Sequence, residues 1–198
     1  MSPAPRILAG YTLSTRIGRV GASERWLARP PARAGLPSPV VVKVLEGGLA
    51  RDEAFVRRFE HEAQVLARVE SPHLPPLFDA GRAGDALYIT TAYVPGWTLR
   101  RIIGDLAEAG ETISPASAID IGRGLCEALA ALHGLTDPRT GGPLGFVHRD
   151  VRPENIVIGE DGRARLVDLG LGTSRLRAGL TEAGVPLGTP GYMAPEQA

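Results

Sequence analysis

Hydrophobic and polar positions along the first 94 residues form the pattern of several strands around one helix. Residues 11–17 alternate between side chains suited to a core and side chains suited to solvent. Residues 40–45 form a continuous apolar run rich in β-branched side chains. Both patterns are typical of strands. Between residues 51 and 69 the apolar positions instead recur every three or four residues, which predicts an amphipathic helix. The expected strands are 11–17, 25–28, 40–45, 77–80 and 86–94, after a loose lead-in over 1–10.

The second half of the chain is predicted to be mainly helical, with one hairpin. Helices are expected over 98–106 and from Ser114 to about residue 133, where Ser114 followed by Pro115 is a favourable helix start. Cys126 lies on the second of these helices and is interpreted as a core residue. Residues 134–145 form a surface loop in this prediction.

The hairpin joins two short apolar runs, 155–158 and 164–167, through an Asp-Gly turn. Asn155 stands at the start of its first strand, and Asp168 follows the second, so the turn is expected to bring the two side chains together. Asp150 lies a few residues upstream. Oxygen ligands of this kind suit Mg²⁺, and a further carboxylate can accept a proton from a hydroxyl group.

Two charged residues occupy apolar surroundings in the first half. Lys43 interrupts the continuous apolar strand, and Glu62 lies on the same helical face as Phe59 and Leu66. Because a buried charge is costly unless it is paired, we expect Lys43 and Glu62 to form an ion pair, in preference to Glu60. The alternatives are a lysine at a sheet edge whose ammonium reaches water, and a glutamate on a solvated helix face.

The order and spacing of the polar residues resemble one family. The string from His148 to Asn155 matches H-R-D-x-x-x-x-N, Asp168-Leu169-Gly170 matches D-x-G, and residues 194–196 read A-P-E. The chain is therefore similar to bacterial eukaryotic-like (Hanks-type) serine/threonine protein kinases. The resemblance implies an α+β, two-lobed protein-kinase fold, in which 11–94 form an N-lobe of antiparallel sheet plus one helix, and 95–198 form part of a mainly helical C-lobe.

The resemblance also implies an activity, ATP-dependent phosphoryl transfer to Ser or Thr hydroxyls of protein substrates, with Mg²⁺ as cofactor. It assigns catalytic roles to Asp150, Lys43, Glu62 and Arg152, and metal binding to Asn155 and Asp168. Nucleotide contacts are implied for Ile17, Gly18, Val20, Gly21, Arg25, Val41, Lys43, Thr91, Ala92, Tyr93, Val94 and Val157.

Three features depart from the family pattern. Val20 and Ser23 replace two glycines of the phosphate-binding loop, and Arg25 replaces the valine that covers adenine. Arg152 stands where a lysine usually contacts the transferred phosphate. The chain ends two residues after the A-P-E motif, so we expect a truncated catalytic domain and little activity from these 198 residues alone. A pseudokinase that binds nucleotide weakly or not at all is therefore one alternative, and a small-molecule kinase is another.

The composition limits which binding partners and which cellular compartment we expect. Lys plus Arg equals Asp plus Glu at 22 each, which gives no support for nucleic-acid binding or a polybasic membrane patch. No apolar run approaches the roughly 20 residues of a membrane span. Cys126 is the single cysteine, which fits a reducing compartment, and we expect a cytoplasmic location. Thr181 is the first candidate for self-phosphorylation through self-association, ahead of Thr173 and Ser174, and Thr189 favours Ser/Thr over Tyr specificity.

Overall fold

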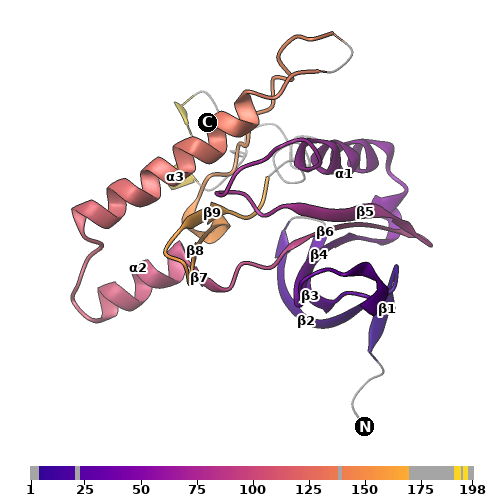
Figure 1. The fold of residues 1–198 in the computed structure, drawn as a ribbon, viewed down its shortest axis with the longest axis horizontal. Coiled ribbons are helices and arrows are strands. Elements are labelled where there is room, and N and C mark those ends of the chain that lie inside the picture. Colours follow the sequence, from indigo (N-terminus) through magenta and orange to yellow (C-terminus); the bar gives the residue numbers. More distant parts are fainter. Residues whose placement is uncertain (1–4, 21–22, 138–139, 170–189, 193, 196–198) are drawn as a thin grey trace. The chain divides into compact units, whose positions relative to one another are not determined.

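The computed structural model describes residues 5–20, 23–137, 140–169, 190–192 and 194–195. These residues belong to two compact units (Figure 1). The first unit takes its described residues from Met1–Ala67 and Pro76–Tyr93, and the second takes most of its own from Arg68–Pro75 and Val94–Gly170. Among the described residues, no helix is both long enough and apolar enough to cross a bilayer.

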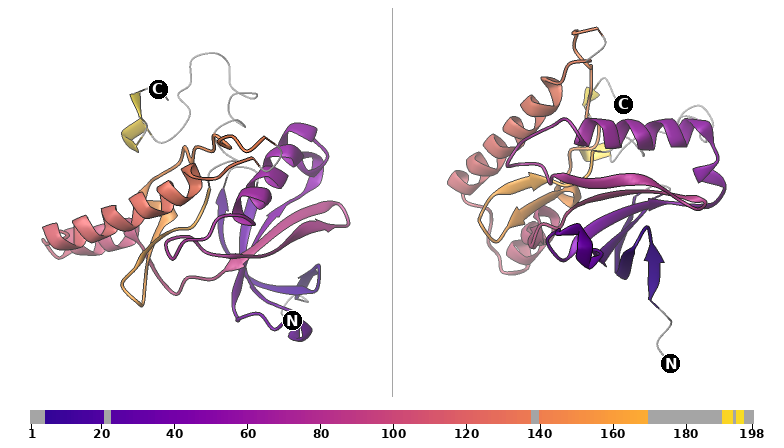
Figure 2. Two further views of the ribbon diagram at one scale, coloured as in Figure 1. Left: turned by 45° about the horizontal axis from the view of Figure 1, so that its top comes forward. Right: turned by 45° about the vertical axis from the view of Figure 1, so that its right-hand side comes forward.

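The first unit is built on a six-stranded antiparallel sheet. Its strand order is β1-β2-β3-β4-β6-β5, so the last two strands of the chain exchange places. The sheet curls, and α1 (Glu53–Leu66) lies along the face formed by β5 and β6, as both views of Figure 2 show. The strands are β1 (Arg6–Leu8), β2 (Tyr11–Val20), β3 (Ser23–Arg29), β4 (Val40–Leu45), β5 (Leu77–Ala83) and β6 (Ala86–Ala92).

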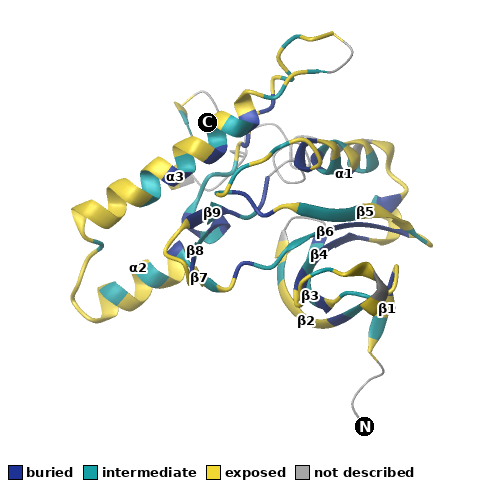
Figure 3. Ribbon diagram, in the orientation of Figure 1, coloured by how far each residue is buried: buried dark blue, intermediate teal, exposed yellow. Residues whose placement is uncertain are grey.

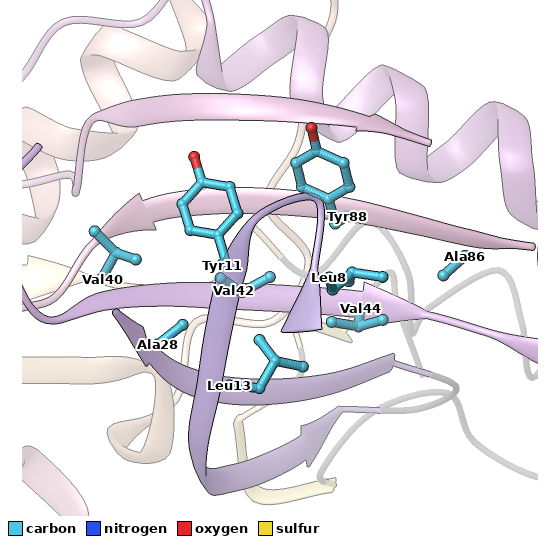
Figure 4. Close-up of a cluster of buried hydrophobic side chains, with 9 residues drawn as sticks. All are labelled: Leu8, Tyr11, Leu13, Ala28, Val40, Val42, Val44, Ala86 and Tyr88. Atoms are coloured by element: carbon cyan, nitrogen blue, oxygen red, sulfur yellow. The ribbon is translucent and has the colours of Figure 1, made fainter. Parts of the chain in front are cut away.

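One face of the curled sheet closes on a hydrophobic core (Figure 4). Alternate residues of β4 point into it because successive side chains of a strand face opposite ways. The aromatic rings of Tyr11 and Tyr88 lie 6.1 Å apart there, and both hydroxyls donate hydrogen bonds to the carboxylate of Asp79. The buried residues of this core are Leu8, Tyr11, Leu13, Ala28, Val40, Val42, Val44, Ala86 and Tyr88.

The opposite face of β4 carries Val41, Lys43 and Leu45, and α1 belongs to this side. The helix buries Phe59, Val65 and Leu66 along one stripe, while its other side is exposed (Figure 3). The spacing of these residues is the helical spacing seen in the sequence.

The second unit contains two helices whose starts have physical causes. The helix α2 (Leu99–Glu108) begins after Thr98, whose side chain accepts a hydrogen bond from the N–H of Arg101. The helix α3 (Pro115–His133) begins after Ser114, whose Oγ accepts from the N–H of Ser117, which confirms the predicted cap.

A three-stranded antiparallel sheet completes the second unit, in the order β7-β8-β9. Its strands are β7 (Gly96–Thr98), β8 (Ile156–Gly159) and β9 (Ala164–Leu166). Only glycine fits at Gly96, which has φ +151°, because a Cβ there would lie 2.1 Å from the carbonyl oxygen of Ile158.

His73 ties β9 to α3 within the second unit. Its Nδ1 lies 2.7 Å from the carbonyl oxygen of Ala164, and its Nε2 lies 3.1 Å from a carboxylate oxygen of Glu127. The backbone carbonyl of His73 also accepts from the N–H of Leu166 at 2.9 Å. A Cβ on Gly124 would lie 2.7 Å from the ring, so the close approach of α3 requires a glycine at this position.

Three features of the fold differ from the predictions. Residues 6–8 form β1 and are no loose lead-in, because they pair with 11–13. Residues 96–98 form β7, a strand that was not predicted and that pairs with β8; the helix predicted from residue 98 follows it directly as α2. Cys126 is exposed, since the stripe of α3 that is buried passes through Ala128 and Leu132 instead.

Candidate active site

The first unit contains a buried ion pair. The Nζ of Lys43 lies 2.8 Å from each carboxylate oxygen of Glu62. The residues are 7% and 3% exposed, so the pair is shielded from water. In such surroundings a charge is tolerated because its partner and its hydrogen bonds replace hydration.

The helix α1 presents Glu62 to the sheet because it shares a face with the buried residues Phe59 and Leu66. Glu60 is exposed. The predicted pairing of Lys43 with Glu62 rather than Glu60 is therefore confirmed.

The same unit contains the hairpin of β2 and β3, where the glycine-rich loop was expected. Strand pairing continues up to Val20 and Ser23, without an open loop before that point. Gly18 pairs with Arg25, which in turn pairs with Lys43 on β4. Ile17 is 45% exposed.

The residues expected around adenine lie along β4 and at the end of β6. Val41 and Thr91 are cross-strand partners and half-buried, and Tyr93 is also half-buried. The backbone N–H of Ala92 donates to the carbonyl of Pro76 at 3.1 Å, so a base contact by Ala92 would use its carbonyl oxygen. Val94 is buried, and Val157 on β8 is half-buried.

The second unit holds the polar loop that precedes β8. His148 is 1% exposed, and its Nδ1 accepts a hydrogen bond from the N–H of Asp150 at 3.3 Å. Arg149 between them has φ +64°, a left-handed conformation that is uncommon for residues other than glycine. His148 thus helps to position Asp150, a role that was not predicted, although His148 is the first residue of the H-R-D motif.

Asn155 connects the loop to the hairpin. Its Nδ2 donates to the backbone carbonyl of Asp150 at 2.9 Å and to the carboxylate Oδ2 of Asp150 at 2.7 Å. Its backbone carbonyl accepts from the N–H of Val167 at 2.9 Å, directly before Asp168. These bonds hold Asn155 between Asp150 and the end of β9, as the predicted hairpin required.

Asn155 and Asp168 fit a site for a hard divalent cation. The Oδ1 of Asn155 is buried and has no hydrogen-bond partner among the described residues, and Asp168 is 5% exposed. Among those same residues no group of three or more His, Cys, Asp or Glu could hold a metal ion. Mg²⁺ needs no such cage, because it takes one or two protein oxygens together with water and substrate phosphates.

Asp150 has the properties of a proton acceptor. Burial raises the pKa of its carboxyl group above the ordinary value, while the positive charge of Arg152 and the hydrogen bond from Asn155 oppose that rise. The Nε of Arg152 lies 3.3 Å from Oδ1 of Asp150. A raised pKa makes the carboxylate a better base.

Several residues named in the sequence analysis lie outside the described residues, and their roles stay predictions. They are Gly21, Gly170, Thr173, Ser174, Thr181, Thr189 and Glu196.

The geometry agrees with the comparison to known families. Residues 35–198 match the family model described as the protein kinase domain. The chain belongs to this family. The matched range includes the pair of Lys43 with Glu62 in the first unit of this kinase domain and the cluster of Asp150, Asn155 and Asp168 in the second.

Curated relatives of this kinase domain include bacterial serine/threonine-protein kinases. PknL of Mycobacterium tuberculosis is 37% identical over 162 residues, which cover 82% of this chain and 37% of the relative. The probable serine/threonine-protein kinase PkwA of Thermomonospora curvata is 34% identical over 194 residues, which cover 98% of this chain and 24% of the relative. The chain thus spans about a third or less of the length of these two relatives.

Solved structures support the fold. The PknI kinase domain of M. tuberculosis matches with a TM-score of 0.68 at 29% identity, over 88% of this chain and 63% of that one. The structure titled PpkA-294 apo form matches with a TM-score of 0.77 over the whole of this chain and 71% of that one. At 21% identity, the second match bears on the fold alone. The protein-kinase fold expected from the sequence is confirmed; the lobe boundaries at residues 94 and 95 stay a prediction.

Proposed function

We propose that this protein transfers the γ-phosphoryl group of ATP to serine or threonine hydroxyls of protein substrates. The observation that carries the proposal is the arrangement of Asp150, Asn155 and Asp168, in which Asn155 is bonded to Asp150 and keeps a buried amide oxygen available. The similarity to PknL and PkwA, both named serine/threonine-protein kinases, supports the substrate class.

Lys43 would hold the phosphates of ATP, and Glu62 would position Lys43. The carboxylate contacts Nζ through both oxygens, which fixes the end of a side chain that is otherwise flexible. A fixed ammonium group favours one placement of the phosphates, and positioning accounts for much of the catalysis in phosphoryl transfer.

Asp150 would orient the substrate hydroxyl and accept its proton. The amide of Asn155 and the guanidinium of Arg152 each contact one of its carboxylate oxygens, which orients the group. Burial raises its pKa, so it holds a proton more readily than an exposed aspartate. Arg152 would also contribute positive charge near the transferred phosphoryl group, in place of the usual lysine.

Asn155 and Asp168 would hold Mg²⁺ through their side-chain oxygens. The ion would supply neutralisation of the phosphate charges. The hydrogen bond from Val167 to the backbone of Asn155 keeps the end of β9 beside the loop, so the two oxygen donors come from segments that are joined.

The remaining assignments follow from this activity. A protein that uses ATP and contains one cysteine suits the cytoplasm. Self-association would allow phosphorylation at Thr181, and a phosphate there would be a partner for Arg149.

The test is phosphate transfer from ATP with Mg²⁺ to a generic protein substrate by the full natural protein, followed by identification of the phosphorylated residues by mass spectrometry. We expect phosphoserine and phosphothreonine, and a fall of at least about 100-fold in kcat for Asp150→Asn, since general-base catalysis contributes about 10²–10⁴-fold. Asp120→Asn, which removes an exposed carboxylate of α3, is the matched control and should keep full activity. Absence of transfer by the unmodified protein would favour the pseudokinase alternative.

A further inference from the structure

A second cation lies directly beside Lys43 on the sheet of the first unit. Arg25 of β3 is the cross-strand partner of Lys43 on β4, so the two side chains leave the same face of the sheet. The row continues to Gly18 on β2 and Ile89 on β6. This face is opposite the hydrophobic core, because Val42 and Val44 point into that core on either side of Lys43.

The guanidinium of Arg25 occupies the space above Gly18. A Cβ built on Gly18 would lie 3.4 Å from Nη2 and 3.6 Å from Nε of Arg25. The arginine therefore folds back over β2, and the absence of a side chain at residue 18 makes room for it. Its Nε is buried, so the group is part of the packed surface of the hairpin.

The hairpin beneath this guanidinium is paired strand from Gly18 onward, after a shift in register between Arg16 and Gly18. Arg19 pairs with Glu24, and Val20 pairs with Ser23. Phosphate-binding loops depend on backbone N–H groups that side chains leave accessible. Here β2 is paired with β3 as far as Val20 and Ser23, two positions where the family pattern has glycine.

We propose that Arg25 binds the phosphate groups of the nucleotide that Lys43 anchors. A triphosphate carries several negative charges, and two cations from neighbouring strands on one face of the sheet can contact more of its oxygens than Lys43 alone.

The chemistry of the side chain specifies the ligand class. A guanidinium presents a planar set of donors that matches two oxygens of one phosphate, whereas an ammonium acts as a point charge. Arg25 and Lys43 together would therefore recognise the polyphosphate rather than the base. The inference rests on the proposed function, since it assumes that Lys43 is the anchor for ATP.

Calorimetry on the full natural protein tests this assignment with two probes, Mg²⁺-ATP and adenosine. Arg25→Val, which installs the family's usual residue, should weaken ATP binding about 10- to 100-fold, the effect of losing hydrogen bonds to a charged group. Adenosine carries no phosphate, so its affinity should stay within about twofold. Arg25→Lys keeps the charge without the planar donors and should fall between the unmodified protein and Arg25→Val.

Arg19→Val is the matched control, because it removes an exposed cation from the adjacent position on the same hairpin. It should leave both affinities unchanged. Equal or tighter ATP binding by Arg25→Val, or equal weakening of ATP and adenosine, would overturn the inference and leave the proposed function in place. If the unmodified protein binds no Mg²⁺-ATP, the proposed function fails, and the inference fails with it.

Discussion

Removal of one partner from the pair of Lys43 and Glu62 should destabilise the first unit strongly. In Lys43→Met, the carboxylate of Glu62 remains 3% exposed but loses the ammonium group that contacts both of its oxygens. Breaking a buried pair in this way costs about 3–5 kcal/mol, because the charge that stays buried loses the partner that offsets its desolvation. We expect a loss of that size in the free energy of unfolding from urea titrations.

The double variant Lys43→Met/Glu62→Leu separates this explanation from a simple loss of packing. Replacement of both charges by apolar groups leaves neither member of the pair as a buried charge, so the double variant should be more stable than either Lys43→Met or Glu62→Leu. Its ATP binding should nevertheless be lost, because the phosphate anchor is gone.

The pair of Glu53 and Arg57 on the same helix provides a matched control. Its atoms also approach to 2.8 Å, but the side chains are 84% and 68% exposed. Removal of either partner should cost about 0.5 kcal/mol or less. A cost for Lys43→Met no larger than that of this control, or a double variant less stable than both single variants, would contradict the assigned role of the buried pair.

Two further predictions concern the second unit. Gly124→Ala should lower the free energy of unfolding by about 1–3 kcal/mol, because its Cβ would lie 2.7 Å from the ring of His73. Gly122→Ala meets open space in the same helix and should raise the free energy of unfolding by up to about 1 kcal/mol. Urea titrations measure both changes. Arg152→Gln removes the charge that lowers the pKa of Asp150, so that pKa should rise further and the acid limb of kcat/KM should move to higher pH in a pH–rate profile.

Each of these predictions has an outcome that contradicts it. Equal effects of the two glycine substitutions would show that His73 can move away from α3. For the pH profile the control is Arg101→Gln, an exposed arginine of α2 paired with Asp105, which should leave the acid limb in place. A limb that stays put or moves to lower pH in Arg152→Gln would contradict the assigned role of Arg152.

The sequence predicted most reliably those elements in which local pattern and burial agree. Val40–Leu45 is a strand with the predicted bounds because its apolar run is buried on both faces. Lys43 and Glu62 could be paired from sequence because each was the exception in an apolar setting. The cap at Ser114 depends on neighbouring residues only, and it was also predicted.

The predictions failed where contacts between residues distant in sequence determine the local structure. The strand β1 has three residues, too few to show an alternation of apolar and polar side chains, and it forms because it pairs with β2. The strand β7 depends on β8, which approaches so closely that residue 96 must be glycine. Cys126 was assigned to the core from its helix, but which stripe of a helix is buried depends on the elements packed against it.

Within the site, the position of Arg25 was the least predictable feature. The sequence shows an arginine at a place where valine is usual, and that difference alone suggests a damaged nucleotide site. Only the register across Gly18, Arg25 and Lys43 shows that Arg25 is the cross-strand neighbour of Lys43, the proposed phosphate anchor. Register is set by long-range pairing, which composition and period do not specify.

The most direct test of the central claim is the Mg²⁺ dependence of ATP binding by the full natural protein, measured by calorimetry beside Asp168→Asn. ATP binding should strengthen with Mg²⁺ in the unmodified protein and should lose that dependence in Asp168→Asn. Asp161→Asn, at the exposed turn of the same hairpin and paired with Arg165, should behave like the unmodified protein. Mg²⁺-dependent binding that survives in Asp168→Asn, or that is lost equally in Asp161→Asn, would contradict the metal site at the end of β9.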